Sequence, residues 1–257
     1  MFPRPFLIAL QFLTRVPVRL DHPPNAQELG RSLLWYPVVG LLLGTLLWTA
    51  ASALAHAPPP LRAALLLTLW VLTTGALHLD GLADTADAWA GGRGDRERAL
   101  AIMKDPHVGP VAVVIVALVL LLKFASIEAL SNGRGLDVLV LAPLLARTAM
   151  PLLFATTPYV RASGIGSALA TNLPRQSAHI VGVLVCGAVV FSCGWEGAWA
   201  AVVALGMFML LRSLLMRRLC GMTGDCGGAM IELIETALLI ALASTAGEFP
   251  LIAAAAI

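Results

Sequence analysis

The sequence predicts an all-α, polytopic helical membrane protein with about seven transmembrane helices in one domain. The 257-residue chain is 59% hydrophobic and only 12% charged. A soluble domain carries about 25% charged residues, so a water-soluble surface cannot be built around this many apolar side chains. The apolar runs are rich in Leu, Ala and Val, and aromatic residues make up only 6%, which favours helices over a barrel. A formal net charge of +2 supplies no basic face for nucleic acid.

The individual helices follow from the lengths of the apolar runs, because a span needs about 20 apolar residues. The first 18 residues are too short to span and are interrupted by Arg and Pro, so they predict an amphipathic helix in the membrane interface rather than a cleavable signal. No linker divides residues 1–257, so a single integral membrane domain is expected. Seven spans are predicted near Leu33–Leu54, Leu61–Leu79, Val108–Ile127, Val138–Thr156, Ile180–Phe191, Gly197–Leu215 and Ala229–Ala246.

The orientation follows from the lysines and arginines, which accumulate on the cytoplasmic side of membrane proteins. With the N-terminus inside, 13 of the 17 cations fall in inside segments, whereas Arg62, Arg134 and Lys123 fall outside. Seven spans then place the C-terminus outside. The inside connections are also the long, polar ones. We therefore expect a multi-pass membrane protein whose candidate chemistry lies on the cytoplasmic face.

Three carboxylates follow the second predicted span. Asp80, Asp84 and Asp87 lie at spacings i, i+4 and i+7, which places them within about 60° on one helix face. Like charges repel there unless a cation lies among them, and all-oxygen ligands favour Mg²⁺. The spacing therefore predicts a Mg²⁺ site with Asp80, Asp84 and Asp87 as ligands. The alternative is a solvated acidic helix end.

Further candidates lie in the inside loops and the last span. Lys104, Asp105 and His107 precede the third span and can meet anionic oxygens or handle protons. Asp225 lies in the glycine-rich segment TGDCGGA, read as a turn whose backbone N–H groups could cradle a phosphate. Glu232 and Glu235 follow inside an apolar helix. Carboxylates at that depth are costly, so a functional role is their default interpretation.

Arg147 lies near the middle of the fourth predicted span and requires an anionic partner or a water-filled cavity. The partner can be a fixed acid, with Glu232 and Glu235 the nearest candidates in kind, or a substrate diphosphate. We favour the diphosphate, because the guanidinium fork matches its geometry.

Carboxylates beside cations at a membrane boundary indicate metal-assisted chemistry on a diphosphate. Three functions remain open on the residues alone. The first is transfer of a phospho-group from a nucleotide diphosphate to an alcohol, as in CDP-alcohol phosphotransferases. The second is an intramembrane prenyltransferase. The third, a transporter, ranks last because the acids crowd one end of the helices instead of the bilayer midplane.

Several stretches resemble the adenosylcobinamide-GDP ribazoletransferase (cobalamin synthase) family. HLDGLADTADAW with RALAIMKDPHVGP looks like its first acidic motif and following loop, and TGDCGGAMIELIE looks like its C-terminal motif. FLTRVPV and YPVVGLLLG are similar too, so the likeness runs from about Phe6 to Leu242. Cys226 and the alanine in ADAWAGG are mild departures, and neither removes a candidate ligand.

The resemblance implies a Mg²⁺-dependent transferase of cobalamin biosynthesis. Such an enzyme joins adenosylcobinamide-GDP to α-ribazole, or to α-ribazole 5′-phosphate, and releases GMP. Its partners would be these small molecules and membrane lipid, and homo-oligomer formation stays open. On this reading Asp80, Asp84 and Asp87 hold the metal, and Asp84, Asp87, Asp105 and Asp225 are the catalytic candidates. The substrate-binding candidates are Lys104, His107, Arg147, Glu232 and Glu235.

Overall fold

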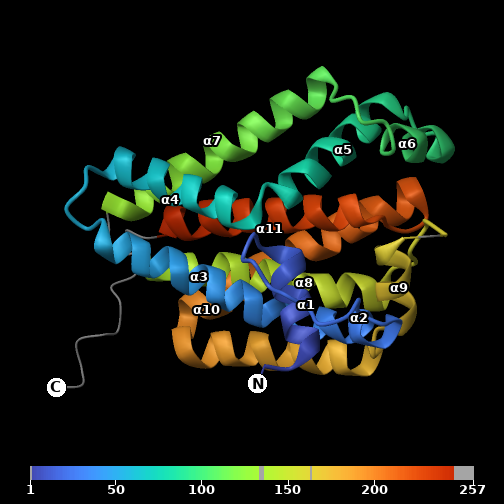
Figure 1. Cartoon of the computed structure of the whole chain (residues 1–257). Helices are drawn as coiled ribbons and strands as arrows, with labels where there is room; N and C mark the ends of the chain where they lie inside the picture. Colours follow the sequence, from blue (N-terminus) through green and yellow to red (C-terminus); the bar gives the residue numbers. More distant parts are fainter. Residues whose placement is uncertain (1, 133–135, 163, 246–257) are drawn as a thin grey trace.

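A computed structural model describes residues 2–132, 136–162 and 164–245, and all named elements of the described part are helices (Figure 1). Arg134 and the apolar tail after Thr245, both considered above, lie outside these residues. The elements are α1 (Arg4–Leu13), α2 (Ala26–Ser32), η1 (Leu33–Trp35), α3 (Tyr36–Ala53), α4 (Pro59–Thr74), α5 (Leu77–Gly91), α6 (Arg96–Ile102), α7 (Pro110–Asn132), η2 (Leu136–Val140), α8 (Leu141–Thr156), α9 (Ile165–Asn172), α10 (Arg175–Leu219) and α11 (Gly224–Thr245).

The described residues include five helices that are long and apolar enough to cross a membrane, or up to six if α4 and α5 form one broken span. This confirms the all-α polytopic class with a smaller count than the predicted seven. The difference between six spans and the predicted seven lies in α10. Its 45 residues contain Gly194, whose φ of 54° and ψ of −128° are not helical. The predicted fifth and sixth spans are therefore the two halves of α10, which turn back on one another in Figure 1.

The core lies around α8 and α11. Their apolar windows are 83% and 72% buried, whereas those of α7 and α10 are only 28% and 17% buried. Helix α3 approaches α8 through Gly40 and Gly44. A Cβ at Gly40 would lie 2.5 Å from the Pro143 carbonyl oxygen, and one at Gly44 would lie 2.7 Å from the Val140 Cα. Small residues four apart allow such close helix contact in membranes. The apolar outer faces of α7 and α10 are left for lipid.

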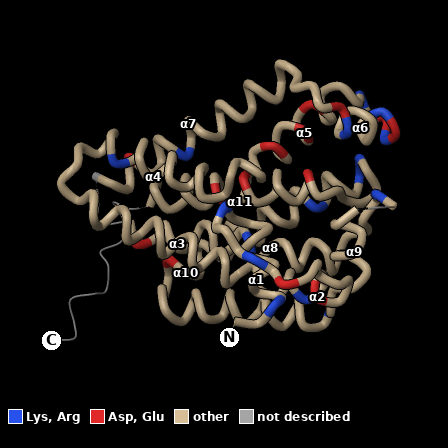
Figure 2. Tube along the Cα trace, in the orientation of Figure 1, with Lys and Arg blue, Asp and Glu red and all other residues tan. Residues whose placement is uncertain are grey.

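The N-terminal helix α1 packs on the bundle. Phe6, Ala9 and Leu13 are buried in the main core, and the Arg4 Nε donates to Glu28 Oε1 of α2 at 2.7 Å. The predicted short helix is therefore present, with much of its apolar side against protein. Figure 2 shows charged residues gathered around α1, α2 and α6, with acidic residues also on α5 and α11.

Candidate active site

Helix α5 carries the predicted acidic stripe, and a bend at its start sets its direction. Gly75 and Ala76 have φ of 64° and 57°, in the left-handed region. This conformation is routine for glycine and costs about 1–2 kcal/mol for alanine. Helices α4 and α5 consequently meet at 87°. The span predicted over Leu61–Leu79 is thus interrupted, because the chain bends inside the apolar run.

Glycines bring α5 against α11 and so place Asp225 beside the stripe. A Cβ at Gly81 would lie 2.7 Å from the Asp225 carbonyl oxygen and 3.0 Å from its Cα. A Cβ at Gly228 would lie 3.2 Å from the His78 carbonyl oxygen. The segment TGDCGGA thus forms the start of helix α11, where the sequence predicted a turn. Gly228 serves close helix packing, whereas a Cβ at Gly224 would meet nothing within 4 Å.

The structure gathers Asp80, Asp84 and Asp225 into one group, which we call the carboxylate face. Asp84 interacts electrostatically with Asp225 and Asp80, and also with Arg161. Asp80 is exposed, while Asp84 and Asp225 are half-buried, so the face is open to solvent. Three negative charges meet one cation here. The excess of negative charge suits a cationic ligand.

Arg161 is the residue that sequence reasoning missed. It donates from Nη2 to Asp225 Oδ2 at 2.7 Å and to the Met103 carbonyl oxygen at 3.2 Å. A short parallel pairing positions it: the Met222 N–H donates to the Pro158 carbonyl, and the Val160 N–H donates to the Met222 carbonyl. The only signal in the sequence was a cation in a long polar loop. Arg161 gives the carboxylate face a group that can contact phosphate oxygens.

Asp87 has a different role from its two neighbours on α5. Its Oδ2 accepts from the Gly109 N–H at 2.6 Å, and its Oδ1 accepts from the Ala112 N–H at 2.9 Å. Both oxygens therefore bind the free N–H groups at the start of α7, where a carboxylate also interacts favourably with the helix dipole. This geometry supports a structural cap for Asp87, in place of the predicted metal ligand or catalytic group.

The predicted loop candidates lie at the edge of the site. Lys104, Asp105 and His107 are all exposed. Asp105 Oδ1 accepts from the His107 N–H at 3.0 Å and lies 2.5 Å from His107 Nδ1. These hydrogen bonds, the backbone one foremost, lower the pKa of Asp105 below its ordinary value. The loop starts beside Met103, which Arg161 contacts, so it borders the carboxylate face without entering it.

A second charged group is fully enclosed between α7, α8 and α11. We call Lys123, Arg147, Glu232 and Glu235 the buried charge cluster; each is at most 5% exposed. Lys123 Nζ donates to Glu232 Oε2 at 2.6 Å and to Glu235 Oε2 at 2.5 Å. Lys123 thus binds acids inside the bundle instead of extending to the outer surface. Two positive and two negative charges balance within the cluster.

The position of Arg147 bears on the two alternatives left open for it. Its Nη1 forms an ion pair with Glu235 Oε1, and its Nη2 lies 3.3 Å from His78 Nδ1. With 1% of its surface exposed, it presents nothing to a substrate in this arrangement. The geometry favours the fixed acid over the substrate diphosphate that the sequence led us to prefer. The two acids are paired in the same cluster: Glu232 with Lys123, and Glu235 with both Lys123 and Arg147.

The oxygen donors of the carboxylate face fit Mg²⁺ if the protein supplies only part of the ligand shell. Among the described residues, no group of three or more His, Cys, Asp or Glu side chains is arranged to hold a metal ion. Mg²⁺, however, usually binds one or two carboxylates and completes its shell with water and substrate phosphates. Asp80 and Asp84 offer oxygen donors of this kind at an accessible surface. This donor set would fit such an ion with two carboxylates of α5, and not with the three that the sequence predicted.

Comparison with known proteins identifies the family. The family described as Cobalamin-5-phosphate synthase matches residues 5–243. This chain belongs to that family. Curated relatives named adenosylcobinamide-GDP ribazoletransferase include one from Pseudomonas putida, 57% identical over 242 residues, and one from Pseudomonas entomophila, 58% identical over 241 residues. A third, from Pseudomonas aeruginosa, is 55% identical over 241 residues, and each alignment covers 93% of this chain and 98% of the relative.

As a member of the Cobalamin-5-phosphate synthase family, the chain carries both acidic segments on which the resemblance rested, one on α5 and one at the start of α11. No solved structure matches it significantly. The pairing of α5 with α11 through Gly81 is therefore a finding of the present structure, and it explains why the two segments form one site.

Proposed function

We propose that this chain is an adenosylcobinamide-GDP ribazoletransferase. It joins adenosylcobinamide-GDP to α-ribazole, or to α-ribazole 5′-phosphate, late in cobalamin biosynthesis. The observation that carries the proposal is the match to relatives of that name over nearly the whole chain. The carboxylate face adds to it an accessible, phosphate-compatible site of the kind that such a reaction needs.

The reaction is a displacement at phosphorus. A hydroxyl oxygen of α-ribazole forms a bond to the phosphorus attached to cobinamide, the bond from that phosphorus to the bridging oxygen breaks, and GMP leaves with that oxygen. The proton of the hydroxyl passes to a carboxylate, which acts as a general base. Arg161 binds a phosphate oxygen and offsets the charge that develops on the diphosphate. Asp225, held by Arg161 and Thr223, keeps that arginine in place.

Asp80 and Asp84 would hold Mg²⁺ on the same face. When bound, the ion supplies charge neutralisation on the diphosphate oxygens and on the leaving group. Asp84 is the more enclosed of the two carboxylates, whereas Asp80 is exposed. This arrangement leaves room for the water and phosphate ligands that Mg²⁺ retains.

We also propose that the protein is a multi-pass protein of a bacterial inner membrane, with the carboxylate face on the cytoplasmic side. The cation asymmetry of the sequence supports this orientation. The nucleotide substrate would then be reached directly from the cytoplasm.

Purified protein in detergent tests the function. With adenosylcobinamide-GDP, α-ribazole and Mg²⁺, we expect equal amounts of adenosylcobalamin and GMP, and none in the presence of EDTA. Glu97→Gln, which changes an exposed acid of α6, is the control for Asp84→Asn. Turnover of a prenyl diphosphate with an aromatic acceptor, without any turnover of adenosylcobinamide-GDP, would replace this proposal with the prenyltransferase alternative.

A further inference from the structure

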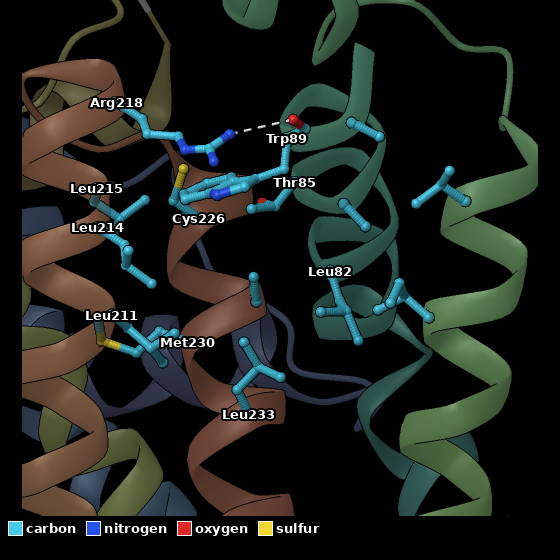
Figure 3. A pocket seen from close by; sticks show the side chains of 15 residues that line it. Leu82, Thr85, Trp89, Leu211, Leu214, Leu215, Arg218, Cys226, Met230 and Leu233 are labelled. Atoms are coloured by element: carbon cyan, nitrogen blue, oxygen red, sulfur yellow. Dashed lines mark hydrogen bonds between the residues drawn. The ribbon is translucent and has the colours of Figure 1, made fainter. Parts of the chain in front are cut away.

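An apolar groove of about 470 Å³ lies between α5, α7, α10 and α11. Leu82, Thr85 and Trp89 line it from α5. At 100° per residue, these positions point away from Asp80 and Asp84. The groove and the carboxylate face are therefore on opposite sides of α5. We call this cavity the α5–α10 groove (Figure 3).

The α5–α10 groove has one charged end. Figure 3 shows Arg218 and Trp89 at this end, with Leu211 and Leu233 at the other. The Arg218 guanidinium lies 5.5 Å from the Trp89 ring centroid, and its Nη1 donates to the Trp89 carbonyl oxygen at 3.3 Å. Within the described part of the chain, no carboxylate lies within ion-pairing distance of Arg218. Its charge is thus available to an anion.

A second polar group faces the same space. Thr85 lines the groove, is 9% exposed, and its hydroxyl group hydrogen-bonds with the thiol of Cys226, which also lines the groove. Thr85 lies one turn of α5 from Trp89, just below the charged end in Figure 3.

The dimensions and the surroundings identify the occupant. Leu211 and Arg218 are seven positions apart, which is about 10 Å of helix lined by leucine side chains. Helices α7 and α10, whose apolar windows are the least buried of the candidate spans, both contribute to the lining of the groove. A molecule with a hydrocarbon chain and an anionic head group matches it, because the fork of an arginine suits a phosphate.

We propose that the α5–α10 groove binds one anionic phospholipid, with an acyl chain along Leu211 and Leu233 and the head-group phosphate at Arg218. The proposal is independent of the transferase activity. A substrate with a flat apolar base would fit less well, because α5 separates the groove from the carboxylate face, where the hydroxyl group must react.

Native mass spectrometry of the full chain in non-ionic detergent tests the proposal. The protein is titrated with dioleoyl phosphatidylglycerol or dioleoyl phosphatidylcholine, which carry the same chains. We expect one phosphatidylglycerol to bind more tightly than phosphatidylcholine. Arg218→Gln should weaken phosphatidylglycerol binding about fivefold, the effect of one arginine at a membrane surface. Arg217→Gln makes the same charge change outside the groove and should leave the affinity unchanged.

A groove-filling variant tests the acyl chain separately. Leu211→Trp should weaken binding of both lipids, and Ala90→Trp, at an exposed lining position, serves the same purpose if Leu211→Trp does not fold. Equal affinity for the two lipids would overturn the proposal. Equal weakening by Arg217→Gln and Arg218→Gln would also overturn it, since that result indicates only general surface charge. Displacement of phosphatidylglycerol by α-ribazole would instead assign the groove to a substrate.

Discussion

Gly81 of α5 and Asp225 of α11 lie backbone against backbone, so that a Cβ on Gly81 would stand 2.7 Å from the Asp225 carbonyl oxygen. Even alanine must therefore push the two helices apart and separate the two acidic segments. We expect Gly81→Ala to lower the free energy of unfolding by about 1–3 kcal/mol and to remove most of the transferase activity. Thermal melting and product formation measure the two effects.

The matched control for Gly81→Ala is Gly206→Ala. Gly206 is also helical, but nothing lies within 4 Å of the Cβ that would be added. This variant should melt no lower than the parent, because alanine is the better helix former. If both variants behave like the parent, the contact between Gly81 and Asp225 does not define the site.

The two acids Asp84 and Asp87 should behave differently although they share a helix face. Asp84→Asn should reduce turnover at least about a hundredfold with an unchanged melting temperature, because a ligand of the proposed Mg²⁺ is lost. Asp87→Ala should mainly destabilise the protein, by about 1–2 kcal/mol, because the start of α7 loses its cap. Kinetics and melting of the two variants, measured side by side, check this. A stable but inactive Asp87→Ala would restore Asp87 to the catalytic group.

Arg161 is expected to act on the substrate. Arg161→Met should raise the KM for adenosylcobinamide-GDP and lower kcat, because a phosphate contact and the anchor of Asp225 are both lost. Arg161→Lys should recover only part of the activity, since lysine lacks the guanidinium fork that contacts two acceptors. Arg175→Met, an exposed cation at the start of α10, is the control. A parental KM in Arg161→Met would contradict the proposed contact.

The buried charge cluster predicts that a second substitution restores part of the stability lost when Arg147 is replaced. Arg147→Met leaves two buried acids, Glu232 and Glu235, facing the single cation Lys123, and should destabilise the protein by about 3–5 kcal/mol. The double variant Arg147→Met with Glu235→Gln should melt higher than the single variant, because the excess buried negative charge is then removed. Thermal melting in detergent measures both. A stable Arg147→Met with weakened adenosylcobinamide-GDP binding would return Arg147 to the substrate.

Reporter fusions test the proposed orientation. Fusions at Ala57 and Asn132 should report the outside, and fusions at Arg93 and Gly166 should report the cytoplasm, because the cation-rich segments remain inside. A cytoplasmic signal at Asn132 would contradict the orientation and place the carboxylate face on the other side.

The helical class and the acidic stripe could be predicted because both depend on local sequence. Long apolar runs become α3, α7, α8, α10 and α11, and the spacing of Asp80 and Asp84 places them together on α5. The bend before α5 was missed because it lies inside an apolar run. One of its two left-handed residues is also Ala76, and alanine rarely adopts that conformation.

The parts of the site that could not be predicted are contacts between distant segments. Arg161 reaches Asp225 because residues 158–160 pair with Met222, and no spacing along the chain encodes that pairing. The functions of Asp84 and Asp87 also cannot be separated by sequence. Both lie on one helix face, and only the position of α7 assigns Asp87 to a helix end.

With the Asp87 cap on α7, each of the helices α5, α7 and α11 contacts the other two. Asp87 ties α5 to the start of α7, Lys123 ties α7 to Glu235 of α11, and the contact of Gly81 with Asp225 ties α11 back to α5. Because each helix is held to both of the others, none of the three can shift without breaking one of these contacts. The carboxylate face is therefore preorganised, and little conformational entropy remains to be lost when a charged ligand arrives.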